Sequence, residues 1–137
     1  QRRHDRAPGI PFSVLLFDID RFKQINDTWG HPQGDLVLKG IVQLVQGQLR
    51  NIDTLARWGG EEFALLLPQT GAAEARAVAE KLCLALAQAE FGKVGRVTAS
   101  FGVATCQADE SGAALLERVD EALYGAKRNG RNRVEVS

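Results

Sequence analysis

The sequence predicts an α+β fold in which helices flank a mostly antiparallel sheet. The prediction rests on an apolar run typical of a central strand, a Gly-Gly pair between two short β-rich runs, and intervening segments with helical apolar spacing. A chain of 137 residues, 45% of them hydrophobic, is long enough for one core and too short for two. We therefore expect residues 1–137 to form a single domain with the element order βααββαβαβ.

The first elements follow from apolar runs and from the turn residues that interrupt them. Residues 1–10 are polar and end near a Pro-Gly pair, so we expect the remnant of a preceding helix followed by a turn. Residues 12–19 are nearly all apolar and predict a central strand that is covered on both faces. A short helix is expected over residues 21–29, and a long amphipathic helix over residues 32–50.

The second half of the chain alternates β-rich runs with segments rich in helix-forming residues. A hairpin is expected where the two glycines separate two β-rich runs, and the following helix is dense in Ala, Leu and Glu. Gly130 is placed to cap the last helix. The expected elements are strands at residues 54–58 and 62–67, a helix at 72–90, a strand at 94–106, a helix at 113–129 and a strand at 134–136.

The charge balance excludes one class of function. Lys and Arg total 17 and match 17 Asp and Glu, so the chain lacks the basic surface with which proteins bind nucleic acid through many phosphates. A small phosphorylated ligand needs only a few cations. No run approaches the ~20 apolar residues of a membrane span, so we expect no membrane contact by this domain. The two cysteines form no CxxC pair, which favours free thiols in a reducing cytoplasm over a zinc site.

Asp18 and Asp20 end the apolar run of the first strand. Burying a carboxylate costs several kcal/mol unless a partner compensates it, so this strand end is expected to open onto a site, with a hard cation as the natural partner. Strand alternation places both carboxylates on one face. Asp20 also directly precedes the short helix, so a helix N-cap and a role in the site both stay open for this residue.

Two further segments carry residues suited to chemistry. In the first, Gly59 and Gly60 precede Glu61 and Glu62. Glycines at a hairpin tip permit positive φ and a close approach of the backbone to a ligand, whereas the plain alternative is a turn with solvated acids. In the second, residues 127–133 (KRNGRNR) are strongly basic. They complement a helix dipole or form a phosphate clamp opposite the carboxylates.

Together these segments resemble a known family. The blocks FDIDRFKQINDTWGHPQGD, RWGGEEF and ALYGAKRNGRNRV are similar in order and spacing to those of the GGDEF diguanylate cyclases, in the GGEEF variant, over about residues 12–134. The resemblance implies a fold like the palm of adenylyl cyclases and polymerases. It also implies condensation of two GTP into cyclic di-GMP (c-di-GMP), with release of two pyrophosphates and with Mg²⁺ or Mn²⁺ as cofactor.

The resemblance also implies a metal site. By match to the family motifs, the metal ligands would be Asp18, the carbonyl of Ile19, Glu61 and Glu62. Glu61 would in addition be the base that activates a 3′-hydroxyl group. Such a set suits phosphoryl transfer, which needs positioned reactants and neutralised charge on the phosphate oxygens.

The substrate contacts that the match implies fall into two groups. Those expected at the triphosphate are Lys23 (a catalytic cation), Lys127, Arg131, Phe22, Gly59 and Gly60. Asn26 and Asp35 would read guanine, because an amide and a carboxylate suit the edge of that base. His31, in the loop between them, either supports the base pocket or is an ordinary turn histidine.

The family match also implies dimerisation and feedback. Each domain would hold one GTP, so two copies must meet as a homodimer, and the isolated domain should be weakly active. Arg50 and Asp53 match the RxxD inhibitory site of the family, where Arg would bind phosphate or guanine of the product c-di-GMP and Asp a guanine edge. The alternative is a helix-end Arg with a turn Asp. Lys81 is a candidate for a second cation at that site.

Two departures from the family pattern concern the start of the chain. The sequence lacks the family's N-terminal DxLT segment and contains no Met, so we expect a catalytic domain fragment with an unknown N-terminal regulatory domain in the parent protein. An active cyclase is favoured over a catalytically silent c-di-GMP or GTP receptor, because Asp18 and the whole GGEEF signature are present. A purely structural dimerisation module would leave these matches unexplained. We expect a cytoplasmic domain, whether or not the parent protein is membrane-tethered.

Overall fold

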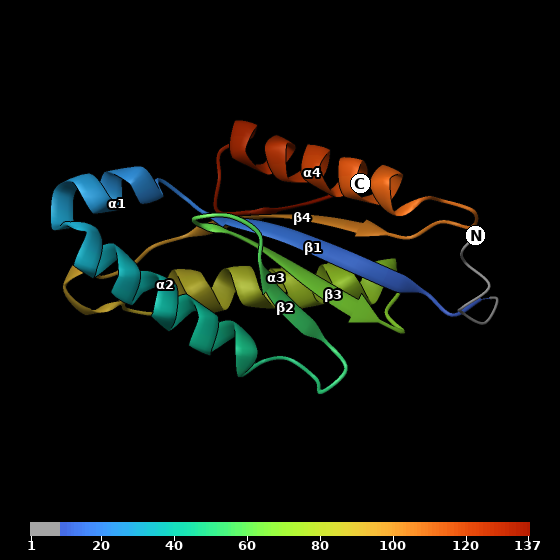
Figure 1. Ribbon diagram of the computed structural model, residues 1–137, viewed down its shortest axis with the longest axis horizontal. Coiled ribbons are helices and arrows are strands. Elements are labelled where there is room, and N and C mark those ends of the chain that lie inside the picture. Colours follow the sequence, from blue (N-terminus) through green and yellow to red (C-terminus); the bar gives the residue numbers. More distant parts are fainter. Residues whose placement is uncertain (1–8) are drawn as a thin grey trace.

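A computed structural model describes residues 9–137, which form a five-stranded sheet with helices on both faces (Figure 1). Most of the expected helix remnant, residues 1–8, lies outside the described residues. The elements in chain order are β1 (Phe12–Ile19), α1 (Phe22–Trp29), α2 (His31–Gln46), β2 (Thr54–Arg57), β3 (Glu62–Pro68), α3 (Ala72–Gln88), the 3₁₀ helix η2 (Gly92–Val94), β4 (Ala99–Thr105), α4 (Gly112–Arg128) and β5 (Val134–Val136). Apart from the short 3₁₀ helix, this is the predicted order.

The strand order in the sheet is β2-β3-β1-β4-β5, so β1 lies at the centre. β1 is antiparallel to both β3 and β4, and β2 is antiparallel to β3. β5 differs, because the chain crosses over through α4 and returns parallel to β4. The sheet is therefore mixed, and the expected antiparallel pairing holds for its other four strands.

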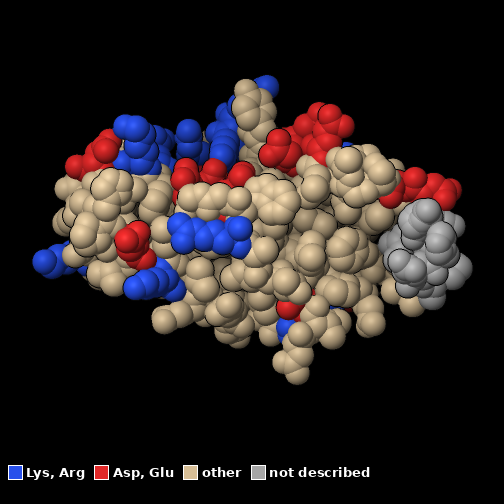
Figure 2. Space-filling view, in the orientation of Figure 1, with Lys and Arg blue, Asp and Glu red and all other residues tan. Residues whose placement is uncertain are grey.

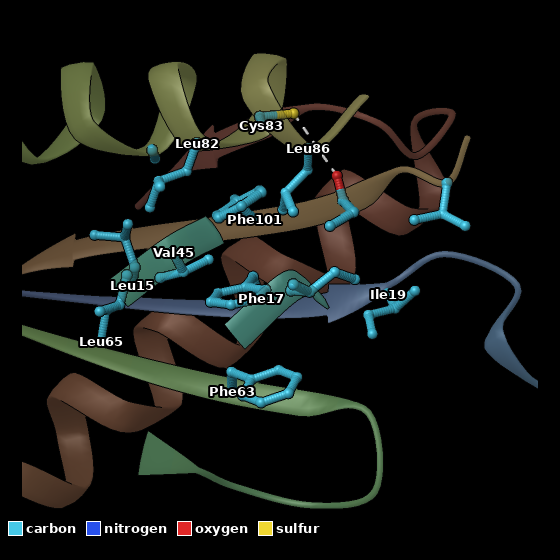
Figure 3. Close-up of a cluster of buried hydrophobic side chains, with 14 of the residues drawn as sticks. Leu15, Phe17, Ile19, Val45, Phe63, Leu65, Leu82, Cys83, Leu86 and Phe101 are labelled. Atoms are coloured by element: carbon cyan, nitrogen blue, oxygen red, sulfur yellow. Dashed lines mark hydrogen bonds between the residues drawn. The ribbon is translucent and has the colours of Figure 1, made fainter. Parts of the chain in front are cut away.

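Three stacked phenylalanines form the centre of the larger core, between the sheet and the helices α2 and α3 (Figure 3). Phe63 on β3 and Phe101 on β4 both pair with Phe17 on β1. The centroid of the Phe17 ring lies 5.1 Å from that of Phe63 and 4.9 Å from that of Phe101. Since alternate residues of a strand face opposite sides of the sheet, the residues directly before and after each of these phenylalanines face α4.

Helix α4 covers the opposite face of the sheet. Leu16 packs there in a second cluster with Leu115, Val119 and Leu123 of α4. At Gly102 on β4, a Cβ atom would lie 2.5 Å from the backbone nitrogen of Leu123, so glycine allows the helix to contact the strand directly. Among residues 9–137, no helix combines the length and apolar character needed to cross a membrane.

The strand predicted over residues 94–106 is shorter in the structure, where β4 begins at Ala99. Gly92 and Gly95 have φ values of 57° and 82°, in the left-handed region that interrupts extended chain. Gly92 therefore opens the 3₁₀ helix, and Gly95 bridges back to Phe91. The β-branched residues between 94 and 98 connect η2 to β4 without entering the sheet.

One helix end differs from the sequence-based expectation and another agrees with it. α2 ends at Gln46 rather than near residue 50, because Gly47 occupies its C-cap and the following residues form a turn. Gly130 ends α4 as predicted, because it directly follows the C-cap residue Asn129 with a positive φ and the N–H of Arg131 donates to the carbonyl oxygen of Ala126. Gly130 follows with a φ of 128° and begins the turn that leads to β5.

Both cysteines of the chain are free thiols, as predicted. Cys83 on α3 is buried, and its thiol donates to the carbonyl oxygen of Ala99 over 3.7 Å (Figure 3). Burial raises the pKa of the Cys83 thiol to about 11, so the thiolate is scarce at neutral pH and the residue is unreactive. Cys106 is half-buried just beyond β4.

Arg118 on α4 is expected to stabilise the fold through Glu110. Its guanidinium donates to both carboxylate oxygens of Glu110, at 2.7 and 2.8 Å, and to the carbonyl of Thr105 at 2.6 Å. Replacing Arg118 with Ala leaves Glu110, whose side chain is 9% exposed, without its partner, and should lower the free energy of unfolding by about 1–3 kcal/mol at pH 7. Urea denaturation measures this difference.

The pH dependence of that difference follows from Glu110. The hydrogen bonds from Arg118 lower the pKa of this carboxyl below its ordinary value of 4.5. A lowered pKa contributes stability that is present above pH 4.5 and is lost as the pH falls through the lowered value. The cost of Arg118→Ala should therefore shrink in acid, and an equal cost at pH 7 and pH 3 would contradict the assignment.

Candidate functional site

Asp18, Glu62 and Lys127 meet at one end of the sheet. Asp18 is the next-to-last residue of β1, and Glu62, the first residue of β3, is its partner across the antiparallel pair. Directly paired residues share a face of the sheet. Lys127 reaches this face from the last turn of α4 and forms an ion pair with Asp18. Residues from β1, β3 and α4 therefore form one charged cluster.

The electrostatics of the cluster favour a bound cation. Burial raises the pKa of the Asp18 carboxyl, in spite of the hydrogen bond and the charge of Lys127, which lower it. Burial and then the charge of Asp18 raise the pKa of the Glu62 carboxyl. Within the described residues, the buried Oδ1 of Asp18 has no hydrogen-bond partner. A cation at this oxygen would favour the ionised form of both carboxylates.

The available donors fit Mg²⁺ or Mn²⁺, which prefer oxygen ligands. Glu61 adjoins the cluster, because its carbonyl oxygen accepts a hydrogen bond of 3.3 Å from the backbone N–H of Ile19. The Ile19 side chain lies in the core, so this residue has only its carbonyl to offer. Among residues 9–137, no three His, Cys, Asp or Glu side chains converge as metal ligands. The fit is thus to an ion that completes its shell with water or substrate oxygens.

The connection between β2 and β3 forms a tip beside this cluster. The backbone N–H groups of Trp58 and Gly59 donate to the carbonyl oxygen of Glu62, at 2.7 and 3.0 Å. Neither Gly59 nor Gly60 has a left-handed φ, so the conformational freedom expected of this pair is not used. A Cβ at Gly60 would meet no atom within 4 Å, and one at Gly59 only the Cβ of Glu62 at 3.9 Å. The fold itself therefore leaves room for side chains at both positions.

Asp20 has three partners, and none belongs to the helix that follows it. Its carboxylate accepts hydrogen bonds from the hydroxyl groups of Thr98 and Ser100, both at 2.6 Å, and from the backbone N–H of Asn132 at 3.0 Å. α1 has no side-chain cap, and its N-cap position is Arg21. The interpretation of Asp20 as a helix cap is therefore wrong, and the residue instead fixes the turn after α4.

That turn carries Arg131. Arg131 and Asn132 have φ values of 63° and 47°, a left-handed conformation that is unfavourable for residues other than glycine. The turn is held by Asp20 and by a 2.9 Å hydrogen bond from the N–H of Arg131 to the carbonyl oxygen of Ala126. Figure 2 shows Lys and Arg side chains gathered between α1 and the C-terminal end of α4, with acidic side chains beside them.

Three of the other candidate substrate contacts lie on α1. Phe22 begins the helix and is buried, and Asn26 is half-buried. At Gly34 on α2, a Cβ would lie 1.9 Å from Oδ1 of Asn26, so this glycine makes room for the amide. Lys23 is exposed and pairs with Asp27 at 3.2 Å. Its ammonium group therefore lies in an ion pair on α1 and outside the Asp18 cluster.

His31 and Asp35 are exposed at the start of α2. Asp35 lines a pocket of about 490 Å³ together with Lys39, Arg57 and apolar residues of α2. The pocket thus joins the beginning of α2 to the last residue of β2. Asn26 and Asp35 come from two consecutive helices, α1 and α2.

Arg50 and Asp53 form a compact turn between α2 and β2. The Arg50 guanidinium binds the Asp53 carboxylate at 2.8 Å and also donates to the Pro68 carbonyl and the Thr70 hydroxyl, each at 2.8 Å. The hydrogen bonds from Arg50 outweigh burial and lower the pKa of Asp53. Half of the Arg50 side chain, 51%, remains exposed. Lys81 is exposed on the neighbouring helix α3.

Asp18 near the end of β1, Glu62 at the start of β3, the two glycines before it and Lys127 of α4 thus lie together at one end of a mixed five-stranded sheet. Residues 1–133 match the family described as "Diguanylate cyclase, GGDEF domain". The chain therefore belongs to the GGDEF diguanylate cyclase family, as its motifs predicted.

Individual relatives agree with this assignment. Diguanylate cyclase A of Treponema denticola is 46% identical over 129 residues, covering 91% of this chain and 35% of that protein. Diguanylate cyclase DgcP of Pseudomonas aeruginosa is 45% identical over 139 residues, covering 99% of this chain and 20% of that protein. The chain thus spans about a third or less of the length of these curated relatives.

Solved structures share the fold. The GGDEF domain of DgcB from Caulobacter crescentus, crystallised with c-di-GMP, has a TM-score of 0.88 and 35% identity, covering 93% of this chain and 78% of that one. The active GGEEF domain of a diguanylate cyclase from Vibrio cholerae has a TM-score of 0.87 and 38% identity, covering 92% of this chain and 82% of that one. SiaD from P. aeruginosa, solved with its activator SiaC, has a TM-score of 0.90 and 39% identity, covering 98% of this chain and 53% of that one.

Proposed function

We propose that this domain condenses two GTP into c-di-GMP and two pyrophosphates across a homodimer, with Mg²⁺ or Mn²⁺. The observation that carries the proposal is the pairing of the buried Asp18 with the half-buried Glu62 beside the two glycines of the β2–β3 connection. One oxygen of Asp18 has no hydrogen-bond partner in the described residues, and the other forms an ion pair with Lys127. The two carboxylates and the cation supply opposite charges to a metal and to a triphosphate at one place. The relative from C. crescentus, whose structure contains c-di-GMP, supports the product.

In this proposal, Asp18, Glu61, Glu62 and the Ile19 carbonyl hold the metal. When bound, the ion neutralises charge on the phosphate oxygens and lowers the pKa of the attacking hydroxyl group. The 3′-oxygen of one GTP forms a bond to the α-phosphorus of the other, the bond to pyrophosphate breaks, and the hydroxyl proton passes to the Glu61 carboxylate. The same transfer in the opposite direction, with Glu61 of the second copy, closes the ring and releases the second pyrophosphate.

The remaining residues position the substrate. Lys127 leaves its ion pair with Asp18 and binds the triphosphate. Arg131, in the turn that Asp20 holds, binds the triphosphate as well. Lys23 leaves its exposed pair with Asp27 to add a third cation, a rearrangement that costs little because exposed ion pairs are weak. The backbone at Phe22, Gly59 and Gly60 lies against the phosphates.

The guanine base is read between α1 and α2. Asn26 and Asp35 supply an amide and a carboxylate, which match the donors and acceptor on the guanine edge. His31, at the start of α2, supports this pocket. The room that Gly34 leaves for the Asn26 amide supports this arrangement, because it brings the amide against α2.

Dimerisation and regulation complete the proposal. Each copy holds one GTP, so two copies must face each other, and the isolated domain is weakly active until something raises its local concentration. In the parent protein, an N-terminal regulatory domain would do so in the cytoplasm, where GTP is found. The product c-di-GMP binds at Arg50 and Asp53 and limits further synthesis.

The test is an assay of an enforced dimer. The chain is fused to a two-stranded coiled coil and incubated with GTP and Mg²⁺, and the product is separated by chromatography. We expect c-di-GMP formation at least tenfold faster per domain than in the unfused chain, because the dimer turns an encounter into an intramolecular step. Retained c-di-GMP binding without synthesis would instead indicate a receptor.

A further inference from the structure

Arg57, the last residue of β2, clamps the glycine tip. Its Nε donates to the carbonyl oxygen of Gly59 at 3.1 Å, and its Nη2 donates to the carbonyl oxygen of Gly60 at 2.5 Å. Over residues 9–137, no carboxylate forms an ion pair with this guanidinium. The guanidinium of Arg57 thus donates to the backbone of the tip and not to a carboxylate.

This clamp fixes the orientation of two peptide groups. In a trans peptide, the C=O of one residue and the N–H of the next point in opposite directions, and no peptide bond in residues 9–137 is cis. Because the Gly59 and Gly60 carbonyls face Arg57, the N–H groups of Gly60 and Glu61 face away from it. Neither N–H has an acceptor in the described part of the chain, although the neighbouring N–H groups of Trp58 and Gly59 both do.

Gly59 and Gly60 are exposed, and Glu61 is half-buried. The Cβ positions at Gly59 and Gly60 are free, so neither packing nor a left-handed φ accounts for two glycines in succession. Two adjacent N–H groups without acceptors form the kind of concavity that binds anions. Glu61 lies next to the Asp18 cluster, through the hydrogen bond from Ile19 to its carbonyl oxygen.

We propose that Arg57 is a positioning residue, which turns the N–H groups of Gly60 and Glu61 outward as donors to the triphosphate of GTP. This inference rests on the proposed function and adds to it a residue that acts through the backbone. Arg57 also lines the pocket that contains Asp35, so one guanidinium lies between the expected guanine end and the expected phosphate end of the substrate.

The test compares nucleotides that differ only in phosphate number. The ligands are 3′-deoxy-GTP, which cannot react because it lacks the attacking hydroxyl, and 3′-deoxyguanosine, which has no phosphate. Affinities are measured by calorimetry with Mg²⁺ for the unsubstituted chain and for Arg57→Lys and Arg57→Gln. A lysine keeps the charge but cannot hold two carbonyls in the planar geometry of a guanidinium.

We expect both Arg57 variants to bind 3′-deoxy-GTP about tenfold or more weakly and to bind 3′-deoxyguanosine unchanged. The matched control is Arg76→Gln, which removes an exposed guanidinium from α3, outside the proposed substrate site, and should bind both ligands as the unsubstituted chain does. A variant that merely unfolds would lose both ligands together. Amide NMR signals of Gly60 and Glu61 should shift with 3′-deoxy-GTP in the unsubstituted chain and not in Arg57→Lys.

If Arg57→Lys and Arg57→Gln bind 3′-deoxy-GTP as tightly as the unsubstituted chain does, or if the Gly60 and Glu61 signals of the unsubstituted chain do not shift, the role of Arg57 is overturned. The binding experiments test the role of Arg57 independently of the proposed cyclase reaction. If the unsubstituted chain binds 3′-deoxy-GTP but its enforced dimer makes no c-di-GMP, the cyclase proposal fails while the binding comparison still decides the role of Arg57. If the unsubstituted chain does not bind 3′-deoxy-GTP, both proposals fail.

Discussion

Replacing Asp18 with Asn should reduce c-di-GMP synthesis by about a thousandfold or more, without lowering the stability of the domain. The loss follows from the position of this carboxylate, which is buried and has one oxygen without a partner. Asn keeps the shape but removes the charge that a divalent cation requires. A thousandfold loss corresponds to roughly 4 kcal/mol, within the several kcal/mol of transition-state stabilisation that a metal ion supplies.

The expected effect of Asp18→Asn on the free energy of unfolding follows from the pKa of Asp18. Burial raises the pKa of Asp18 above its ordinary value of 3.8, so the folded state prefers the protonated form. Such a group contributes stability below pH 3.8 and loses it as the pH rises through the raised value, so at pH 7 its charge opposes folding. A neutral Asn avoids that cost, although it also gives up the ion pair with Lys127.

Three measurements check Asp18→Asn. Chromatography of an enforced dimer gives the rate, thermal unfolding gives the stability, and electron paramagnetic resonance of free Mn²⁺ gives metal binding without catalysis. Glu80→Gln is the matched control, because Glu80 is an exposed carboxylate on α3 that forms an ion pair with Arg76 at the helix surface. Wild-type synthesis or unchanged Mn²⁺ affinity in Asp18→Asn would contradict the metal assignment, and a lower unfolding temperature would contradict the stability argument.

Replacing Arg50 with Ala should weaken c-di-GMP binding by about a hundredfold and remove product inhibition. Arg50 already holds Asp53, Pro68 and Thr70 through Nε and Nη2, which leaves Nη1 without an acceptor in the described residues. The side chain is thus pre-oriented and still has donors for a phosphate or a guanine. Loss of two charge-assisted hydrogen bonds at roughly 1.5 kcal/mol each corresponds to the expected hundredfold.

Calorimetry with c-di-GMP measures the Arg50→Ala effect, and GTP affinity is measured in parallel as the internal reference. Arg76→Ala removes a comparably exposed arginine from α3 and should leave c-di-GMP binding unchanged. Asp53 is 5% exposed and loses its partner in Arg50→Ala, so the unfolding temperature is recorded as well. Unchanged c-di-GMP affinity in a folded Arg50→Ala variant would show that the product binds elsewhere.

Much of the fold could be predicted because its signals are local. The apolar run of β1, the hairpin around Gly59 and Gly60, and the helical spacing of α2 and α4 each lie within a single short segment. Asp18 could be predicted as a site residue for the same reason, because a carboxylate within an apolar strand is unusual and this can be seen from the neighbouring residues alone. Direct alternation along β1 also placed Asp18 on the face opposite to Phe17.

The parts that could not be predicted depend on distant partners. Asp20 precedes α1 in the manner of a cap, and only the approach of Thr98, Ser100 and Asn132 shows its actual role. The short strand β4 depends on how Gly92 and Gly95 turn, although β-branched residues precede it in sequence. Gly34 reads as an ordinary helix glycine until the amide of Asn26 is placed against it.

The contacts that build the site have a consequence for synthesis of the protein. Asp18 with Lys127, and Asp20 with Asn132, join residues that lie 109 and 112 positions apart. At roughly 5–20 residues per second, a ribosome releases β1 on the order of 5–20 s before the end of α4. Throughout that interval the nascent chain carries Asp18 without Lys127 and Asp20 without Asn132. A chain that stops before α4 therefore lacks both partners, and the charged cluster at this end of the sheet cannot form until α4 and the turn after it have been translated.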